Sequence, residues 1–458
     1  MNEDTRVGII GMGYVGLPLA VSFVDAGLEV VGIEADRGRA TELVAGRSPI
    51  DDIGDERLQA ALGHGLTIVQ PPTPELARVS AIFVCVPTPI NEAKDPDLGA
   101  VLAAARLVRE QLQPNQLVIL QSTTYPGTTN GAFRTELELS GLRAGADFDL
   151  AFAPERVNPG DPATHRGTVP RLVGGVTPAA TQRAARLLRR INSEVHELSS
   201  PDAAEMAKLL ENVFRNVNIA LVNQLALLCE RMGLDVWEVV DAAATKPFGF
   251  MPFRPGPGVG GHCIPVDPYY LSWRARQFGF VDRFVEVAGD INFGMPRHVV
   301  DLVVQALNDR GKALNGSRVG LIGVAFKPNV RDARNSPAAE IASLLSKRGA
   351  LVSYHDPHVP AFRDTGGRAL ERSELARLIA TCDVLVATTL HAGIDWAAVY
   401  ERGELVVDTV NSSMGHDVRE KQVLRLGAGW TPAAAPPTTV EEPAGAVEPG
   451  TEVVRSPV

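Results

Sequence analysis

Cys263 lies in the sequence Gly256-Pro-Gly-Val-Gly-Gly-His-Cys-Ile-Pro-Val-Asp-Pro268. Glycines and prolines at this density exclude regular secondary structure and predict an exposed loop over the whole stretch. A thiol on such a loop is either a reactive group or an accident of composition, and the residues alone leave both open. Asp267, four residues further on, could orient a water molecule or a hydroxyl group. The other cysteines lack zinc-like spacing and are interpreted as core residues; they are Cys85, Cys229 and Cys382.

Lys208 and Asn212 form a second candidate group, because residues at i and i+4 share one face of a helix. Both are polar in a stretch that is otherwise apolar. One interpretation is a solvated stripe on a surface helix. The other is functional, because a cation and an amide donor on one face can stabilise a developing oxyanion.

A third group is Gly11-Met-Gly-Tyr-Val-Gly16, which follows an apolar run and opens a helical pattern. In a dinucleotide site the first glycine makes the turn, the second admits the pyrophosphate and the third allows the helix to pack on the strand. Glu34 ends the next strand, where a carboxylate accepts hydrogen bonds from a ribose. This favours NAD over NADP, although Arg37 and Arg39 weaken the preference. The alternative is a tight turn without a ligand.

Strands and helices must position these groups. Apolar runs alternate with helical segments over roughly the first 195 residues, and the pattern returns at Arg318-Val-Gly-Leu-Ile-Gly-Val-Ala-Phe. The predicted fold is α/β, with two Rossmann-like doubly wound domains joined by a long central helical spine. The predicted boundaries are 1–198 for a dinucleotide domain, 199–312 for the helical dimerisation and catalytic region, 313–430 for the second Rossmann-like domain and 431–458 for a disordered tail.

The spine is predicted from residues 203–232, which contain no proline and repeat apolar residues at helical spacing. Pro201 and Asp202 provide a start signal and Gly233 a stop signal. A helix of this length extends about 45 Å. It is long enough to join two domains or to form a subunit interface.

Composition narrows the function classes. The chain has 458 residues, 45% hydrophobic residues and a formal net charge of −10. The charge gives no support to a nucleic-acid or anionic-membrane partner. Neither a signal peptide nor an apolar run of membrane-spanning length is visible, so we expect a cytoplasmic protein with reduced thiols and no metal site.

Taken together, these features resemble the UDP-glucose/GDP-mannose dehydrogenase family, over about residues 5–425. The order and spacing of the motifs make coincidence an unsatisfactory explanation. The matching motifs are Gly-x-Gly-Tyr-Val-Gly at 11–16, Val86-Pro-Thr-Pro89, Ser122-Thr123, Pro154-Glu-Arg156, Lys208-Leu-Leu-Glu-Asn212, Gly260-Gly-His-Cys-Ile-Pro-Val-Asp267, and Phe326-Lys327 with Arg334.

The resemblance implies NAD as the cofactor, a UDP-sugar as the substrate and a homodimer. The residues implied for NAD are Gly11, Gly13, Tyr14, Val15, Gly16, Glu34, Arg39, Thr88, Thr123 and Arg334. Those implied for the UDP-sugar are Glu155, Arg156, Val157, Lys208, Asn212, Arg254, Gly260 and Lys327, with Arg254 acting either within its own subunit or across a dimer.

The resemblance also implies a four-electron oxidation. The C6 alcohol of the sugar becomes an aldehyde, which Cys263 attacks to form a thiohemiacetal. The oxyanion would be held by Lys208 and Asn212. A second oxidation gives a thioester, and water releases the acid. In this scheme Thr123 and Asp267 position water or the reacting hydroxyl. Glu155 is a candidate acid/base.

The sugar is indicated by Ala153-Pro-Glu-Arg-Val-Asn-Pro-Gly-Asp161, which departs from the pattern of UDP-glucose enzymes. It lacks a second glutamate, with Pro159 in that place, which puts in doubt any hydrolytic role that needs two glutamates. It resembles the branch acting on UDP-N-acetylhexosamines. Ser272-Trp-Arg-Ala-Arg276 is most like the UDP-N-acetylglucosamine 6-dehydrogenases.

Several alternatives stay open. Within the family they are dehydrogenases of UDP-N-acetylmannosamine, UDP-N-acetylgalactosamine or UDP-glucose. Outside it, a two-electron NAD-dependent hydroxyacid dehydrogenase would form one NADH per substrate and leave the Cys263 loop unexplained. A non-enzymatic nucleotide-binding regulator would have a broken catalytic set, whereas Lys208, Asn212, Cys263 and Asp267 are all present.

Overall fold

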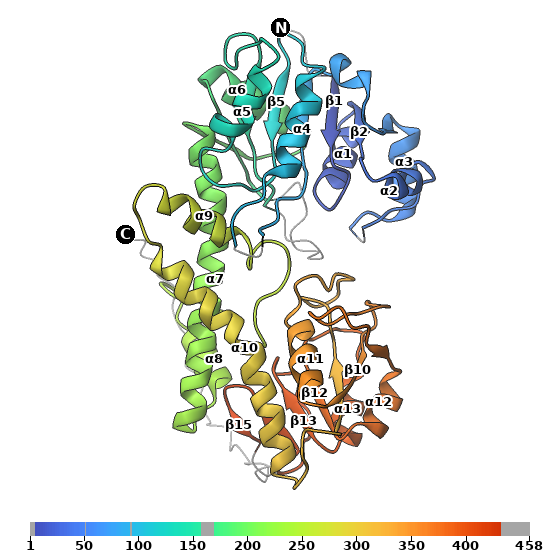
Figure 1. Ribbon diagram of the computed structural model, residues 1–458, viewed down its shortest axis with the longest axis vertical. Helices are drawn as coiled ribbons and strands as arrows, with labels where there is room; N and C mark the ends of the chain where they lie inside the picture. Colours follow the sequence, from blue (N-terminus) through green and yellow to red (C-terminus); the bar gives the residue numbers. More distant parts are fainter. Residues whose placement is uncertain (1–4, 51, 92–93, 157–168, 432–458) are drawn as a thin grey trace, which may run out of the picture.

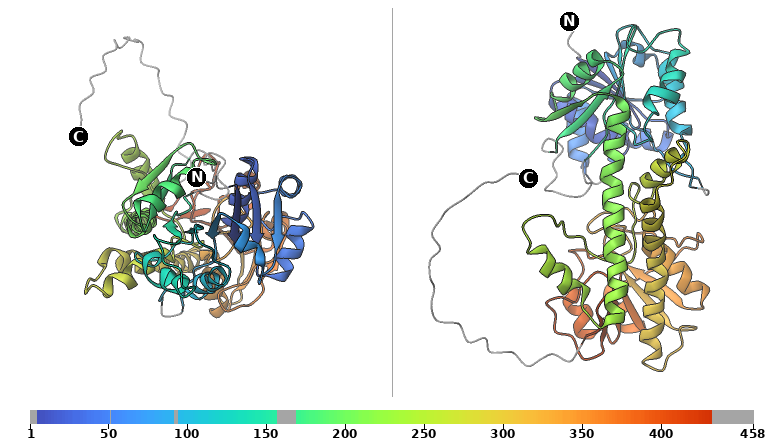
Figure 2. Two further views of the ribbon diagram at one scale, coloured as in Figure 1. Left: turned by 90° about the horizontal axis from the view of Figure 1, so that it is seen from above. Right: turned by 90° about the vertical axis from the view of Figure 1, so that its left-hand side faces the viewer.

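The computed structural model describes residues 5–50, 52–91, 94–156 and 169–431. It contains two α/β units joined by the long helices α7 (Pro201–Met232) and α10 (Arg283–Asn308). Figure 1 shows one unit above the other, and the right-hand view of Figure 2 shows α7 running between them. This confirms the predicted α/β class with a central helical spine.

The first unit contains an eight-stranded sheet in the order β3-β2-β1-β4-β5-β6-β7-β8. Neighbouring strands are parallel except for β6 and β7. The strands are β1 (Arg6–Ile10), β2 (Glu29–Ile33), β3 (Leu66–Val69), β4 (Ala81–Val84), β5 (Leu117–Leu120), β6 (Asp149–Phe152), β7 (Arg171–Gly175) and β8 (Val195–Leu198). The helices are α1 (Gly16–Asp25), α2 (Arg37–Val44), α3 (Asp55–Gly63), α4 (Gly99–Arg109), α5 (Arg134–Glu138) and α6 (Pro178–Leu188), with short η1 (Pro74–Arg78) and η2 (Thr129–Phe133).

Strands β4 and β5 are fully buried because helices pack on both faces of the sheet. The carboxyl ends of the parallel strands therefore meet at one edge, where ligands of open α/β sheets bind. Gly11, Glu34, Thr88, Thr123 and Glu155 follow β1, β2, β4, β5 and β6 respectively. The topology thus brings five predicted site residues to one edge.

The second unit repeats this plan in a seven-stranded sheet of order β11-β10-β9-β12-β13-β14-β15. The strands are β9 (Arg318–Ile322), β10 (Leu351–His355), β11 (Glu371–Arg372), β12 (Val384–Ala387), β13 (Val406–Asp408), β14 (Val423–Arg425) and β15 (Gly429–Trp430). The helices are α11 (Pro337–Lys347), α12 (Leu375–Thr381) and α13 (Trp396–Arg402). Thr431, predicted to open a disordered tail, is instead buried and donates its N–H to Val423 O at 2.9 Å. The rest of the predicted tail lies outside the described residues.

The turn after β9 is filled by the protein's own carboxylate. Asp356, which follows β10, accepts hydrogen bonds from the N–H groups of Val324 and Ala325 at 2.6 and 3.0 Å. His391 lies 3.0 Å from the same carboxylate, and both side chains are fully buried. The donors that would face a phosphate in a dinucleotide site are therefore already satisfied.

Helix α7 follows its sequence signals. Ser200 caps its start by accepting from Ala203 N at 3.1 Å, and Gly233 ends it in the left-handed conformation at φ 69°. Unlike an ordinary surface helix, α7 buries polar side chains and exposes apolar ones. Lys208 and Asn212 are 9% and 4% exposed, whereas Leu210 is 63% exposed. The solvated-stripe interpretation of Lys208 and Asn212 is wrong.

The loop after α8 (Val236–Ala244) leads to α9 (Asp267–Arg276). The prediction that the whole stretch 256–268 is irregular is wrong at its end, because Asp267 and Pro268 are the first two residues of α9. Proline is tolerated there since the first N–H groups of a helix have no partner within it. Within the described residues, no helix combines the length and the apolar character needed to cross a bilayer.

Candidate active site

The glycine turn after β1 requires glycine for steric reasons. Gly11 has φ +91°, and a Cβ there would lie 2.4 Å from Cys85 O. A Cβ on Gly16 would lie 1.9 Å from Gly11 O. On Gly13 a Cβ would meet no described atom within 4 Å, so the outer side of the turn is open. The turn therefore leaves space beside the start of α1 where a pyrophosphate fits. Tyr14 and Val15 complete it.

Glu34 lies where the ribose acceptor was predicted. It is 4% exposed, and its carboxylate accepts from Met12 N at 3.2 Å and Asp36 N at 2.9 Å. Arg39, predicted to contact the cofactor, lies 3.5 Å from the same carboxylate. The acid is thus fixed against the glycine turn, with a cation beside it.

The loop after β4 is anchored to α9. Tyr270 is fully buried, donates its hydroxyl to Pro89 O at 3.1 Å and also bonds the side chain of Thr88. Ser122, after β5, accepts from Val86 N at 2.9 Å. Thr123, beside Ser122, is half-buried. These bonds tie the sheet edge that carries Thr88 and Thr123 to the helix that carries Asp267.

Glu155 and Arg156 follow β6 and are held by protein contacts. Gln121 donates to the Glu155 carboxylate at 3.3 Å, and the buried Arg171 guanidinium lies 3.5 Å from it. Arg156 pairs with Glu211 of α7 at 2.7 Å. Val157, also predicted to contact the substrate, lies outside the described residues.

Cys263 is exposed on its loop, as predicted. Desolvation by the surrounding protein raises the pKa of its thiol to about 11, with Asp267 adding to the shift. The charges of Lys208, Arg215 and Lys327 act in the opposite direction. The group therefore rests as a thiol and needs a proton acceptor before it can act as a nucleophile.

Lys208, Asn212 and Asp267 form a buried polar group beside this loop. Asn212 Nδ2 donates to Asp267 Oδ2 at 2.5 Å, and Asp267 N donates to Cys263 O at 2.7 Å. Burial raises the pKa of the Asp267 carboxyl to about 7, while Lys208 and the Asn212 hydrogen bond lower it. A carboxyl with this pKa can accept or release a proton at neutral pH.

The second unit contacts the Cys263 loop through the segment between β9 and α11. Asn335 donates its side-chain amide to Gly261 O at 3.1 Å, and a Cβ on Gly260 would lie 2.8 Å from Asn335 O. The predicted substrate residue Gly260 thus permits a close approach of this segment. The Phe326 side chain lies against both glycines.

A cluster of rings and charges connects the glycine turn with the second unit. The Arg334 guanidinium lies 5.3 Å from the Tyr14 ring centre and pairs with Asp332 at 2.8 Å. His262 lies 3.3 Å from Asp332, with its ring 6.3 Å from that of Tyr14. Desolvation lowers the pKa of His262. Arg334 therefore reaches the predicted cofactor turn from the opposite unit.

Two other predicted substrate residues differ in their surroundings. Lys327 is half-buried, and its charge favours the Cys263 thiolate. Arg254 is half-exposed and pairs with Asp241 of α8. The structure gives Arg254 no contact with Lys208, Asn212 or Asp267 in any described interaction.

Sequence reasoning missed Glu205, which is fully buried one turn before Lys208. Its carboxylate accepts from Thr129 N at 2.9 Å, Thr129 Oγ1 at 2.6 Å and Gly127 N at 2.7 Å. Burial raises its pKa to about 7 despite these bonds. It fixes the segment after Thr123 to α7. Among the described residues, no three His, Cys, Asp or Glu side chains gather as metal ligands.

Family models match three consecutive parts of the chain. They are the NAD binding domain of the UDP-glucose/GDP-mannose dehydrogenase family at residues 5–192, its central domain at 202–293 and its UDP binding domain at 320–413. The chain belongs to the UDP-glucose/GDP-mannose dehydrogenase family. It is therefore an NAD-dependent oxidoreductase of the nucleotide-sugar dehydrogenase class, as predicted.

Individual relatives of this chain are also named as UDP-sugar dehydrogenases. A UDP-N-acetyl-D-glucosamine 6-dehydrogenase of Pseudomonas aeruginosa is 39% identical over 361 residues, covering 78% of this chain and 84% of the relative. A UDP-N-acetyl-D-mannosamine dehydrogenase of Pyrococcus horikoshii is 34% identical over 413 residues, covering 89% and 95%. The solved structure of a UDP-D-ManNAc dehydrogenase from Pyrococcus horikoshii superposes with a TM-score of 0.83 at 32% identity, covering 93% and 99% of the two chains.

Proposed function

We propose that this dehydrogenase oxidises the C6 alcohol of a UDP-N-acetylhexosamine, with UDP-N-acetylglucosamine as the preferred candidate, to the uronic acid through a covalent adduct on Cys263. The observation that carries the proposal is the grouping of an exposed thiol with buried Lys208, Asn212 and Asp267. A two-electron dehydrogenase has no need of that thiol. Precursor synthesis for a polysaccharide is the corresponding role.

Individual residues carry the individual steps of the proposed reaction. Asp267, with Thr123, takes the proton of the C6 hydroxyl, because its pKa of about 7 suits proton transfer at neutral pH. NAD, when bound, accepts the hydride in each of the two oxidations. The predicted cofactor residues would hold it: the glycine turn, Glu34, Arg39, Thr88, Thr123 and Arg334.

Asp267, once it has released the C6 proton to solvent, takes the proton of the Cys263 thiol. Cys263 Sγ then bonds to the aldehyde carbon, and the carbonyl oxygen becomes an oxyanion. Lys208 and the second amide hydrogen of Asn212 stabilise this charge. After the second oxidation, water breaks the C–S bond of the thioester, with Glu155 as acid/base. The products are the carboxylate and the free thiol. Overall, one alcohol, two NAD⁺ and one water give one carboxylate, two NADH and three protons.

The identity of the sugar rests on likeness rather than on a contact. The relative with 39% identity is named for UDP-N-acetyl-D-glucosamine, and several with 33–34% for UDP-N-acetyl-D-mannosamine. Dehydrogenases of UDP-N-acetylmannosamine, UDP-N-acetylgalactosamine and UDP-glucose remain alternatives. We place Arg156, Lys327 and Gly260 at the UDP-sugar, and Arg254 either there or at a neighbouring subunit's site.

The proposal predicts the electron count. Purified enzyme with limiting UDP-N-acetylglucosamine and excess NAD is expected to form two NADH per sugar consumed, measured by absorbance and by chromatography of the sugar. Parallel reactions with UDP-N-acetylmannosamine, UDP-N-acetylgalactosamine and UDP-glucose are expected to be slower. One NADH per sugar would favour the two-electron hydroxyacid dehydrogenase. A faster reaction with another UDP-sugar would make that sugar the preferred substrate.

We also propose a homodimer built on α7. This helix exposes apolar side chains at helical spacing: Met206, Leu210, Phe214, Leu221, Leu228 and Met232. The space-filling view also shows apolar side chains beside α9 and α10, where Phe278 and Phe284 are about three-quarters exposed. Exposed apolar side chains that recur along one helix in this way are typical of a protein interface.

Introducing charge into this surface is expected to separate the subunits. Light scattering after gel filtration should give twice the 48.8 kDa chain mass for the wild type and a single chain mass for the double variant Leu221→Glu, Leu228→Glu. Glu238→Gln, an exposed change on α8, is the control. A monomeric wild type would contradict the dimer.

Each of the three predicted domains has its own proposed role. We propose that residues 1–198 bind NAD, 199–312 carry the catalytic and dimer surfaces, and 313–430 bind the UDP group. The cytoplasm is the proposed location, supported by four cysteines that are all free thiols in the structure.

A further inference from the structure

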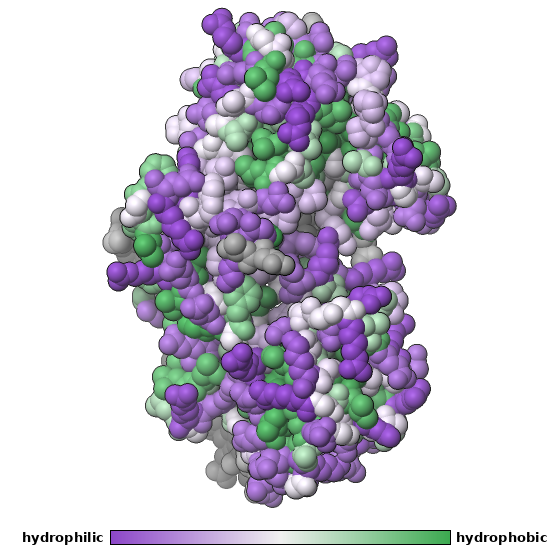
Figure 3. Space-filling model, in the orientation of Figure 1, coloured by the Kyte–Doolittle hydropathy of each residue, from purple (hydrophilic) through white to green (hydrophobic). Residues whose placement is uncertain are grey.

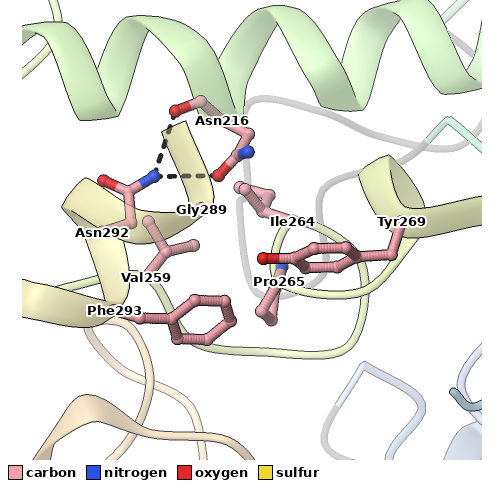
Figure 4. A pocket seen from close by; sticks show the side chains of 8 residues that line it. All are labelled: Asn216, Val259, Ile264, Pro265, Tyr269, Gly289, Asn292 and Phe293. Carbon is pink, nitrogen blue, oxygen red and sulfur yellow. Dashed lines mark hydrogen bonds between the residues drawn. The ribbon is translucent and has the colours of Figure 1, made fainter. Parts of the chain in front are cut away.

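Three buried asparagines form a ladder of amides between α7 and α10. Asn223 Nδ2 donates to Asn292 Oδ1 at 3.0 Å, and Asn292 Nδ2 donates to Asn216 Oδ1 at 2.8 Å. Each of the three is at most 4% exposed. Figure 4 shows the Asn292 amide directed at Asn216, with a second bond to the Asn216 carbonyl at 3.1 Å. Because each amide fixes the orientation of the next, the ladder leaves Asn223 Oδ1 pointing in a defined direction.

The end of the amide ladder binds the loop that carries Cys263. Gly256 N donates to Asn223 Oδ1 at 2.9 Å. At the other end of the loop, Asp267 accepts from Asn212 at 2.5 Å. Asn212 and Asn223 stand eleven residues apart on α7, which corresponds to about 16 Å along a helix. Both ends of segment 256–267 are therefore tied to one rigid helix.

The first part of the loop between these ties is rich in glycine. Four glycines in 256–261 provide no side chain to pack, and glycine loses the most backbone freedom on ordering. Its middle rests on the wall of a small pocket, where Val259, Ile264 and Pro265 face Tyr269 and Phe293 (Figure 4). The second unit also holds the middle of the loop, since Asn335 donates its side-chain amide to Gly261 O at 3.1 Å. The hydrogen bonds at Gly256 and Asp267 are the contacts that link the position of Cys263 to α7.

We propose that Asn223 and Asn292 are positioning residues, which hold the Cys263 loop in register with Lys208 and Asn212 on the same helix. The inference rests on the proposed role of Cys263 as the nucleophile. Loss of the ladder should impair the capture of the aldehyde by Cys263, because a displacement of about 1 Å at a reacting atom can cost on the order of 10²-fold in rate. The first oxidation, which does not use the thiol, is spared.

The first test removes the tie from the loop side, so that the helices are left unchanged. Gly256→Pro deletes the N–H donor, and Gly256→Ala, which retains it, is the matched control because a Cβ there meets no described atom within 4 Å. We expect Gly256→Pro to release aldehyde, trapped with a hydrazine, and to lower the NADH per sugar from two toward one. Gly256→Ala is expected to keep two.

The second test approaches from the helix. Asn223→Leu and Asn292→Leu are compared with Asn218→Leu, since Asn218 bonds the Phe214 carbonyl of its own helix. The first two variants should release aldehyde, and the third should not. If Asn223→Leu is impaired while Gly256→Pro captures aldehyde normally, the ladder serves helix packing alone and the proposal is wrong. The same conclusion follows if both oxidations fall together with the melting temperature.

A readout without turnover separates this inference from the proposed function. Iodoacetamide alkylation of Cys263, followed by mass spectrometry of the intact full-length chain, reports on the loop directly. We expect alkylation on the order of tenfold faster in Gly256→Pro than in Gly256→Ala, because a loosened loop exposes the thiol more fully to solvent and reagent. An unchanged alkylation rate would overturn the ladder's role. A wild type that forms one NADH would overturn the proposed function instead.

Discussion

Cys263→Ala is expected to stop the reaction at the aldehyde and to form one NADH per sugar. The second oxidation should fall by roughly 10⁴-fold or more, the scale seen when a covalent nucleophile is removed. The reason is chemical, since without the sulfur no thiohemiacetal forms and Lys208 and Asn212 have no adduct oxyanion to stabilise. The measurement is NADH yield together with hydrazine trapping of the aldehyde.

The matched control for this variant is Cys382→Ala. Cys382 is a partly buried thiol in the second unit, where desolvation raises its pKa, and it follows α12. Its loss should leave two NADH per sugar. Mass spectrometry of the quenched wild type should show a sugar adduct on Cys263. A Cys263→Ala enzyme that makes two NADH at the wild-type rate would exclude the covalent mechanism.

Asp267→Asn is expected to reduce kcat by about 10²–10⁴-fold, the contribution of a positioned acid or base. The wild-type rate should increase with pH through an apparent pKa near 7, because the carboxyl of Asp267 must be ionised to take a proton. The variant should lose that acidic limb. Rate profiles from pH 5.5 to 8.5 measure both effects. An acidic limb unchanged in Asp267→Asn would assign it to another group.

The same substitution should change how stability depends on pH. The pKa values of Asp267 and Glu205 are both raised to about 7, above their ordinary values of 3.8 and 4.5. The folded state therefore holds two protons that the unfolded state releases, and stability decreases as pH rises from about 4 to about 7. Asp267→Asn removes one of them. Urea midpoints should decline less steeply across this window in the variant, and equal slopes would contradict the assignment.

Local signals in the sequence were enough to predict much of the fold. Pro201 and Gly233, two of the predicted start and stop signals, are the first residue and the C-cap of α7, and strands alternate with helices in both units as the apolar runs predict. The predicted cofactor residues Gly11, Glu34, Thr88 and Thr123 lie at one sheet edge because they follow parallel strands, whereas Arg334 comes from the second unit. These are consequences of backbone chemistry within a few residues, which a single sequence displays.

The environment of each side chain could not be predicted in the same way. Lys208 resembles a surface residue in the sequence but is only 9% exposed in the fold, and Glu205 is buried where residues 127 and 129 donate to its carboxylate. Glu211, the ion-pair partner of Arg156, is 55 residues away in the chain, and Gly256, which donates to Asn223, is 33 residues away. Burial and pairing of this kind depend on tertiary contacts, which hydrophobic periodicity does not encode.

The buried carboxylate of Asp356 determines whether the turn after β9 can bind an anion in addition to the turn after β1. A free phosphate that approached the turn after β9 would compete with an acceptor already tethered in place. The effective concentration of such a tethered group can far exceed the concentration of a free nucleotide. Intramolecular occupation thus blocks the turn as an anion site without altering the strands around it. Among the described residues, the turn after β1 is open on its outer side at Gly13, whereas Asp356 fills the turn after β9, so these two turns offer space for one anion rather than two.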